Sequence, residues 1–219
     1  MEYVQLNWFD LASRLRVDDT RAMTIWNIIA QRYSESSRFY HNLNHILDLI
    51  QIFEENISNI VDHDCVLLSI YFHDIVYDPK SGQNEEESVK LLKETFNQQE
   101  IADALLEKVS DYILATKSHQ GAKRSDTDLL YFLDFDISVL GRSRAEYSKY
   151  SYQIRQEYAH VPHGKYCEGR ATILKRFLYG SDRIYATDNF AEKLEMQARD
   201  NLRWEIDLLE AGTIPSELT

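Results

Sequence analysis

Glycine and proline are scarce in this chain, and that scarcity constrains its fold more than any other feature. Only 7 Gly and 3 Pro occur among 219 residues. These two residue types mark turns and breaks, and between them the apolar residues recur mostly at the three- and four-residue spacing of an amphipathic helix. The sequence therefore predicts an all-α protein. Because no low-complexity linker or internal repeat interrupts it, we expect one domain over residues 1–219.

Cap and break signals divide the chain into individual helices. Residues 65–72 are apolar nearly all round, which is typical of a buried central helix. Loops are expected at 78–82, which contains Pro and Gly, and at 121–125, which is basic. The predicted helices cover about 18–33, 41–55, 62–72, 84–96, 99–117, 126–140, 143–158, 165–179 and 188–211.

Composition excludes several classes of protein. The net charge of -12 disfavours tight binding to long DNA or RNA, because that affinity comes largely from neutralised phosphates. No apolar run reaches the roughly 18 residues of a membrane span, and the N-terminus lacks the pattern of a secretion signal. Two cysteines, Cys65 and Cys167, cannot build a disulfide framework. We therefore expect a cytoplasmic protein with no membrane or long nucleic-acid partner.

Two His-Asp dipeptides occur, and their surroundings distinguish them. His63-Asp64 lies in a polar stretch at a probable helix start, where Asp is a common cap. His73-Asp74 ends the apolar run of the central helix. A charged pair in a buried helix is costly unless it coordinates a cation or finds a partner. The second dipeptide is therefore a candidate metal site.

Further histidines and carboxylates complete this candidate. His41 and His45 are four residues apart, so on a helix they share one face. Asp134 and Asp136 lie downstream, and either can supply the last ligand. Imidazole and carboxylate together suit borderline or hard cations that activate water. This chemistry indicates hydrolysis, most plausibly of phosphate esters.

Five short motifs in a fixed order carry a resemblance to a known family. They are Arg38-Phe39-Tyr40-His41, Phe72-His73-Asp74, Asn84-Glu85-Glu86-Glu87-Ser88, Thr116-Lys117-Ser118-His119 and Leu133-Asp134-Phe135-Asp136. In this order they resemble the HD-domain superfamily of metal-dependent phosphohydrolases, and more closely its bacterial group of predicted HD phosphohydrolases. The resemblance covers about residues 38–170. It implies a single HD-domain helical bundle that binds a divalent metal and hydrolyses phosphate esters.

A second resemblance refines the roles. The Tyr-His-Asn-x-x-His segment that ends at His45 is similar to that of cyclic-nucleotide phosphodiesterases, which implies that His45 is a metal ligand and His41 a general acid. In both families the last ligand tends to be an Asp before an apolar residue, which favours Asp136 over Asp134. The purine-gripping Gln and the aromatic clamp of the phosphodiesterases have no match here, so a cyclic-nucleotide substrate does not carry over. Asn84 stands where some HD proteins have His, which favours one firmly held metal or a second held mainly by Asp74 and water.

The resulting hypothesis assigns a role to each residue. The metal, which is Mn, Mg, Fe, Co, Ni or Zn, is held by His45, His73, Asp74 and Asp136. Catalysis uses His41, Asp74 and Glu85, the last to orient the attacking water. The phosphate is bound by Arg38, Lys117 and His119. The substrate is a nucleotide or another small phosphate ester. Alternatively, Arg38 and Lys117 are solvated surface residues. Glu85 can instead be a carboxylate that only interacts favourably with the dipole of its helix.

Other readings of the chain remain open. An HD scaffold can be a non-catalytic metal- and nucleotide-binding signalling module, or an oxygenase with two irons. The polar residues can also merely cap helices in a structural protein. Downstream, four residues either line a substrate pocket or, as we favour, form helix–helix contacts and an internal ion pair: Arg155, Glu157, Tyr158 and Arg170. The sequence does not give the substrate identity or the oligomeric state.

Overall fold

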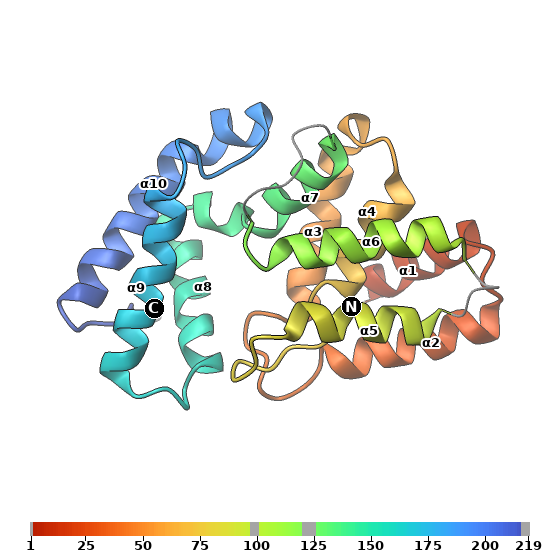
Figure 1. Cartoon of the computed structure of the whole chain (residues 1–219), viewed down its shortest axis with the longest axis horizontal. Coiled ribbons are helices and arrows are strands. Elements are labelled where there is room, and N and C mark those ends of the chain that lie inside the picture. The colour runs from red at the N-terminus through yellow and green to blue at the C-terminus, as the bar shows by residue number, and fades with distance from the viewer. Residues whose placement is uncertain (1, 97–100, 120–125, 216–219) are drawn as a thin grey trace. The chain divides into compact units, whose positions relative to one another are not determined.

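The computed structural model describes residues 2–96, 101–119 and 126–215. Within these residues every regular element is a helix, and no strand occurs (Figure 1). The all-α prediction is therefore confirmed. In chain order the elements are α1 (Glu2–Arg14), α2 (Asp19–Arg32), α3 (Leu43–Glu55), η1 (Ile57–Asn59), α4 (His63–Phe72), α5 (Asn84–Thr95), α6 (Asp103–Thr116), α7 (Thr127–Asp136), η2 (Ser138–Gly141), α8 (Arg144–Glu157), α9 (His163–Tyr179) and α10 (Asp188–Glu210).

The chain divides into two compact units, residues 1–135 and 136–219. Helices α1 to α6 and nearly all of α7 lie in the first unit, and η2 with α8 to α10 lie in the second. The boundary falls inside the last turn of α7, so that Asp136, the last residue of this helix, is the first residue of the second unit. This division does not test the prediction of one domain over residues 1–219, which stays a prediction.

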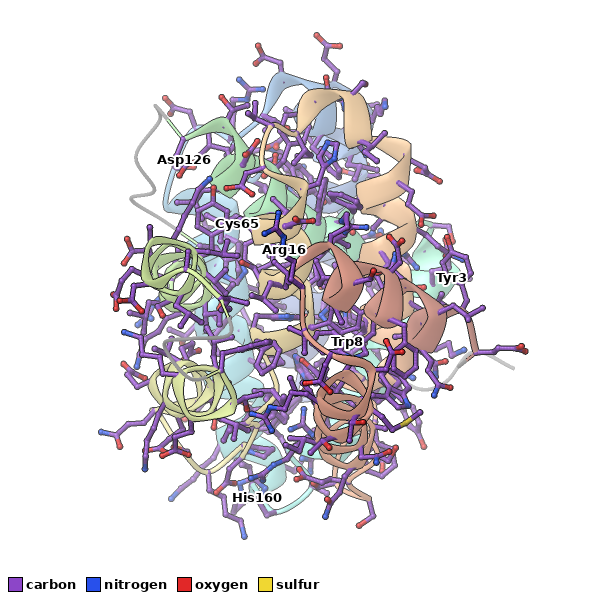
Figure 2. All side chains as sticks on the ribbon, turned by 90° about the vertical axis from the view of Figure 1, so that its right-hand side faces the viewer. Tyr3, Trp8, Arg16, Cys65, Asp126 and His160 are labelled. Carbon is purple, nitrogen blue, oxygen red and sulfur yellow. The ribbon has the colours of Figure 1, made fainter. Side chains whose placement is uncertain are left out.

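Helix α4 is the centre of the first unit, as its apolar sequence predicts. All eight residues from Cys65 to Phe72 are buried, and the helix packs against α1, α3, α5 and α6. The side chain of Asp62 caps its N-terminus by accepting a hydrogen bond from the Cys65 N–H. Trp8 on α1 (Figure 2) is fully buried and packs edge-on against Tyr71. Each such large apolar side chain contributes about 1.5–3 kcal/mol on burial.

Capping residues explain where several helices begin. Asp18, Asn42 and Thr187 each accept a hydrogen bond from a backbone N–H of the following first turn. Ser143 and Glu146 form a reciprocal capping box at the start of α8. A side-chain acceptor in this position satisfies one of the free N–H groups of a helix start. The predicted boundaries agree with the structure to within a few residues wherever such a cap is present.

Three predicted helices need correction. The second one begins at Leu43 rather than at His41, because Asn42 is the N-cap and places His41 outside the helix. The predicted helix 126–140 is interrupted, because Ile137 separates α7 from the short η2. Helix α6 begins at Asp103, and position 99, where it was expected to begin, lies outside the described residues, as does the predicted loop 121–125.

In the second unit, α10 packs along α9 and against η2. The Asn201 side chain donates hydrogen bonds to the carbonyls of Leu140 and Arg142, at 2.8 Å each. A Cβ at Gly141 would collide with the Leu194 side chain of α10, so glycine permits this close approach. None of the helices in the described ranges is long and apolar enough to cross a membrane.

Candidate metal centre

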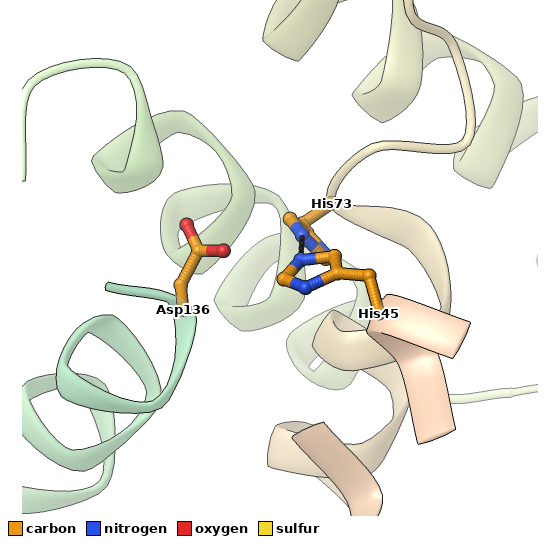
Figure 3. A group of neighbouring side chains, drawn as sticks. All are labelled: His45, His73 and Asp136. Carbon is orange, nitrogen blue, oxygen red and sulfur yellow. Dashed lines mark hydrogen bonds between the residues drawn. The ribbon is translucent and has the colours of Figure 1, made fainter. Parts of the chain in front are cut away.

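Two histidines from neighbouring elements of the first unit meet at the centre of the site. His45 lies in the first turn of α3, and His73 follows the last residue of α4. Both side chains are buried, and their Nε2 atoms are 3.2 Å apart (Figure 3). The capped start of α3 and the C-terminal end of α4 therefore direct two imidazoles at one point.

The second ring nitrogen of His73 has a fixed partner. Its Nδ1 lies 3.0 Å from the carbonyl oxygen of Ile70. Because a carbonyl can only accept, Nδ1 carries the hydrogen in this contact. Nε2 is then the ring nitrogen that faces His45 and the one left to bind a metal ion. A backbone carbonyl that orients a histidine in this way is typical of metal ligands in proteins.

Asp136 completes a three-residue group. Its carboxylate lies within 4.8 Å of the ligand nitrogens of His45 and His73 (Figure 3). Two ligand atoms at about 2.1 Å from one ion lie no more than about 4.2 Å apart, so the group has nearly the spacing of a metal site. Asp134 is buried but is not part of this group. Residues two apart on a helix point about 200° apart, so one of the two carboxylates faces the histidines.

Asp74 adds a second carboxylate to the site. One of its oxygens lies 3.1 Å from Nε2 of His73 and 3.9 Å from Nε2 of His41. Asp74 and His41 keep 18% and 19% of their side-chain surface exposed, whereas His73 is closed to solvent. We call His45, His73, Asp74 and Asp136 the His–Asp cluster. Its open side lies at Asp74 and His41.

His41 reaches the site from a turn and not from a helix. The prediction that His41 and His45 share a helix face is therefore wrong. Asn42 caps the start of α3, so His45 lies in the helix and His41 precedes it. Their rings nevertheless lie 6.0 Å apart. The His41 ring stacks on Tyr77 with centroids 4.2 Å apart and meets the edge of Tyr40. Sequence reasoning missed Tyr77, because nothing in its local pattern distinguishes it from the other 13 Tyr residues.

Arg38 lies behind the cluster with no exposed side-chain surface. Its guanidinium donates to the backbone carbonyls of His41 at 3.2 Å and Asp74 at 2.6 Å. It also donates to the carbonyl of Ile75 at 3.0 Å and to the Glu35 carboxylate at 3.2 Å. These contacts favour a structural role for Arg38 over the direct phosphate contact that the sequence suggested.

The Asn-Glu-x-x-Ser motif anchors the segment that follows the His-Asp pair. The Asn84 side chain accepts from the N–H of Asp78 and donates to its carbonyl, at 3.0 Å each. The buried Ser88 hydroxyl accepts from the N–H of Val76 at 3.1 Å and donates to its carbonyl at 3.3 Å. The start of α5 therefore fixes the backbone just beyond Asp74.

Glu85 and Lys117 lie together, on α5 and at the end of α6. The Lys117 ammonium is 3.7 Å from Glu85, binds the carboxylate of Glu86 and donates to the carbonyl of Gly82 at 2.8 Å. The hydrogen bond to Glu86 raises the pKa of Lys117, and the same bond lowers the pKa of Glu86. His119 follows α6 with a left-handed backbone, and its N–H donates to Ala115. The predicted phosphate-binding roles of Lys117 and His119, and the water-orienting role of Glu85, stay predictions.

The downstream polar residues form internal contacts within the second unit. Arg170 makes a buried ion pair with Glu205, at 3.0 Å between Nε and Oε1. Arg155 donates to the carbonyls of Tyr158 at 2.6 Å and Val161 at 3.3 Å. These contacts agree with the favoured reading of helix contacts and an ion pair. Sequence reasoning missed Glu205, because its partner lies 35 residues away and no local signal pairs them.

No family model, no curated protein and no solved structure matches the chain. Any assignment of function must therefore rest on the chemistry of the His–Asp cluster.

Proposed function

We propose that this chain is a metal-dependent phosphohydrolase acting on a nucleotide or another small phosphate ester. The observation that carries the proposal is the convergence of two buried imidazole Nε2 atoms with the carboxylates of Asp74 and Asp136. The order of motifs that resembles the HD phosphohydrolases supports the same reading.

The electrostatics of the cluster support a bound cation. Nε2 of His73 lies 3.1 Å from a carboxylate oxygen of Asp74, while its Nδ1 hydrogen bonds to a carbonyl. Nε2 of His45 lies 3.2 Å from the same His73 nitrogen. Ring nitrogens and a carboxylate oxygen brought this close together are favourable only with a proton or a metal ion among them. Two imidazoles and two carboxylates match the preferences of Mn, Fe, Co, Ni and Zn ions.

His45, His73 and Asp136 would hold the ion, with Asp74 as a further ligand at the exposed edge. When bound, a divalent ion in such a site lowers the pKa of water and polarises a phosphoryl oxygen. His45 and His73 are buried, whereas Asp74, Asp136 and His41 are partly exposed, so substrate would approach the site past these three residues.

His41 is the residue of the site best placed to donate a proton. Its Nε2 lies 3.9 Å from Asp74, and its ring is held by the stack on Tyr77. The side chain remains partly exposed, so a leaving oxygen can reach it. General acid catalysis by a positioned histidine contributes about 100- to 10,000-fold. We therefore assign His41 as the general acid that protonates the leaving oxygen.

The two His-Asp dipeptides provide a matched test. His73→Gln removes a ligand of the cluster, whereas His63→Gln changes a histidine whose ring nitrogen lies 3.1 Å from the Ile60 carbonyl. Metal content is measured on both purified variants and on the wild type. Phosphatase and phosphodiesterase substrates are then screened with added Mn²⁺, Mg²⁺, Co²⁺ and Fe²⁺. We expect near-stoichiometric metal and turnover in the wild type and in His63→Gln, and the loss of both in His73→Gln.

The other outcomes separate the competing functions. Metal without turnover of any phosphate ester would favour the non-catalytic binding module. Oxygen-dependent chemistry after anaerobic iron loading would favour the oxygenase. A wild type that neither contains metal nor gains activity with any added ion would overturn the proposal.

A further inference from the structure

Arg38 is a charged residue that is enclosed beside the His–Asp cluster. It lies in the loop between α2 and α3, and its side chain has no exposed surface. The guanidinium carbon lies 5.0 Å from the Tyr33 ring and 5.6 Å from the Tyr77 ring. Tyr77 is also the ring on which His41 stacks. Arg38 is therefore not a solvated surface residue, which was the alternative that the sequence left open.

The contacts of Arg38 join two segments that are distant in sequence. One nitrogen, Nη1, donates both to the carbonyl of His41 and to that of Asp74, and Nη2 donates to the next carbonyl, that of Ile75. The first carbonyl belongs to the turn before α3. The other two follow the C-terminal end of α4, where the helix dipole favours a cation. A single guanidinium therefore fixes the turn that carries the general acid against the segment that carries a ligand.

The chemistry of this joint requires arginine. A guanidinium presents five N–H donors in a rigid plane, whereas an ammonium is a compact charge on a flexible stem. Three carbonyls and the Glu35 carboxylate accept from one side chain here. Lysine at this position would keep the charge but could not hold these acceptors at fixed directions.

We propose that Arg38 is a positioning residue of the metal centre, which sets Asp74 and His41 relative to His73. It acts through the backbone and touches neither metal nor substrate. This inference rests on the proposed metal centre. It extends that proposal by assigning the arginine of the Arg-x-Tyr-His motif a structural role, which is to position the residues of the site. Outer contacts that orient metal ligands typically change metal affinity by about 10- to 100-fold when removed.

The test measures binding of Mn²⁺ alone by calorimetry, without any substrate. Arg38→Lys keeps the charge, and Arg38→Met keeps the length while removing every donor. Arg32→Lys and Arg32→Met are the matched controls, because Arg32 pairs with the same Glu35 at 3.5 Å but is 43% exposed. We expect Mn²⁺ binding about 10- to 100-fold weaker in Arg38→Met, a smaller loss in Arg38→Lys, and no change in the Arg32 variants.

A stability control separates positioning from general damage to the fold. Trp8→Phe removes the buried hydrogen bond from the indole to the Ala22 carbonyl in the same unit. It should lower the melting temperature while leaving Mn²⁺ affinity intact. Arg38→Lys should weaken Mn²⁺ binding more than Trp8→Phe does at an equal loss of melting temperature.

Each result has a distinct meaning. Wild-type Mn²⁺ affinity in folded Arg38→Lys and Arg38→Met would overturn the positioning role and leave the proposed function standing. A wild type that binds Mn²⁺ in an Arg38-dependent way but hydrolyses no phosphate ester would overturn the hydrolase alone. A wild type that binds no Mn²⁺, Zn²⁺ or Co²⁺ would overturn both.

Discussion

The molecule contains two polar clusters, which differ in whether a cationic side chain belongs to them. In the second unit Glu205 is fully buried and accepts from Tyr147, from Ser151 at 2.7 Å and from two nitrogens of Arg170. We call these four residues the Glu205 cluster. Each carboxylate oxygen has a donor, and the charge of Arg170 offsets that of Glu205. The cluster is balanced by its own residues.

The His–Asp cluster has a different composition. The atoms that converge there are imidazole nitrogens and carboxylate oxygens, and the nearest pairs are 3.1 and 3.2 Å apart. With the Nδ1 hydrogen of His73 directed at a carbonyl, the short contacts at its Nε2 are favourable only with a proton or a cation among them. Burial alone does not distinguish a functional cluster from a structural one. The comparison points to composition instead: the Glu205 cluster includes a guanidinium, whereas the members of the His–Asp cluster are the residue types that bind metal ions.

The largest effect on the free energy of unfolding is expected from a substitution that removes the negative charge of the Glu205 cluster. Glu205→Gln leaves the Arg170 charge buried without its partner, which typically costs about 3–5 kcal/mol. Urea unfolding measures this loss, and Mn²⁺ binding should not change. Asp200→Asn is the control on the same helix, because its pair with Arg203 is exposed and should change stability by less than about 0.5 kcal/mol. Loss of Mn²⁺ affinity in folded Glu205→Gln would remove the distinction between the clusters.

The second prediction concerns the effect of a metal ion bound at the His–Asp cluster. Mn²⁺ at 100 times its dissociation constant should raise the free energy of unfolding by about 2.7 kcal/mol. Asp136→Asn should abolish this increase. Asp134→Asn should destabilise the metal-free protein, because Asp134 is buried, but should keep the increase. The reverse pattern in the two variants would assign the last ligand to Asp134.

The third prediction concerns the hydroxyl of Tyr147 and its pH dependence. Burial raises the pKa of Tyr147, and the neighbouring Glu205 raises it further. The folded protein therefore keeps this proton after the unfolded chain loses it near pH 10. The stability that depends on this proton is fully present below about pH 10 and falls as the pH rises above it.

Tyr147→Phe tests this expectation. It should cost about 1–2 kcal/mol at pH 8, because Glu205 loses one of its donors. Above pH 10 the variant should lose stability less steeply than the wild type, by up to about 1.4 kcal/mol per pH unit. Urea unfolding between pH 8 and pH 11 gives both numbers. Parallel curves would show that Tyr147 ionises equally in the folded and unfolded states.

Local signals were sufficient to predict every helix except α1 (Glu2–Arg14) and the short η1, for which no helix was expected. Asp18, Asp62 and Ser143 each cap a helix in the structure where the sequence suggested a start. The apolar run to Phe72 correctly indicated a central helix. The errors arose where one local signal overrode another. Asn42 capped the helix that His41 was expected to begin.

Contacts between residues far apart in the sequence could not be predicted from local signals in the same way. The spacing of motifs led to His45, His73 and Asp136, and the structure brings these three together. It did not reveal that Arg38 binds the carbonyls beyond α4, nor that Arg170 pairs with Glu205. Such partners are chosen by helix packing, and helix packing leaves no trace in the neighbouring sequence.

The smallest expected effect concerns Lys117, a charge that already has partners. Because Glu86 raises the pKa of Lys117, the ammonium stays charged, and a phosphate must compete with Glu86 for it. If Lys117 binds substrate, Lys117→Gln should raise KM about fivefold with kcat unchanged, as for loss of uniform binding. Glu86→Gln should instead lower KM about twofold, because it releases the lysine.

The opposite signs make this last prediction decisive for Lys117. Glu87→Gln is the control, because it removes a charge from the same first turn of α5 but pairs with Lys90 at 3.5 Å. A KM that falls equally in Glu86→Gln and Glu87→Gln would reflect the general loss of negative charge near a phosphate. An unchanged KM in Lys117→Gln would show that this lysine does not bind substrate. Its ion pairs would then be structural, like those of the Glu205 cluster. The candidate site would then be confined to the His–Asp cluster and His41.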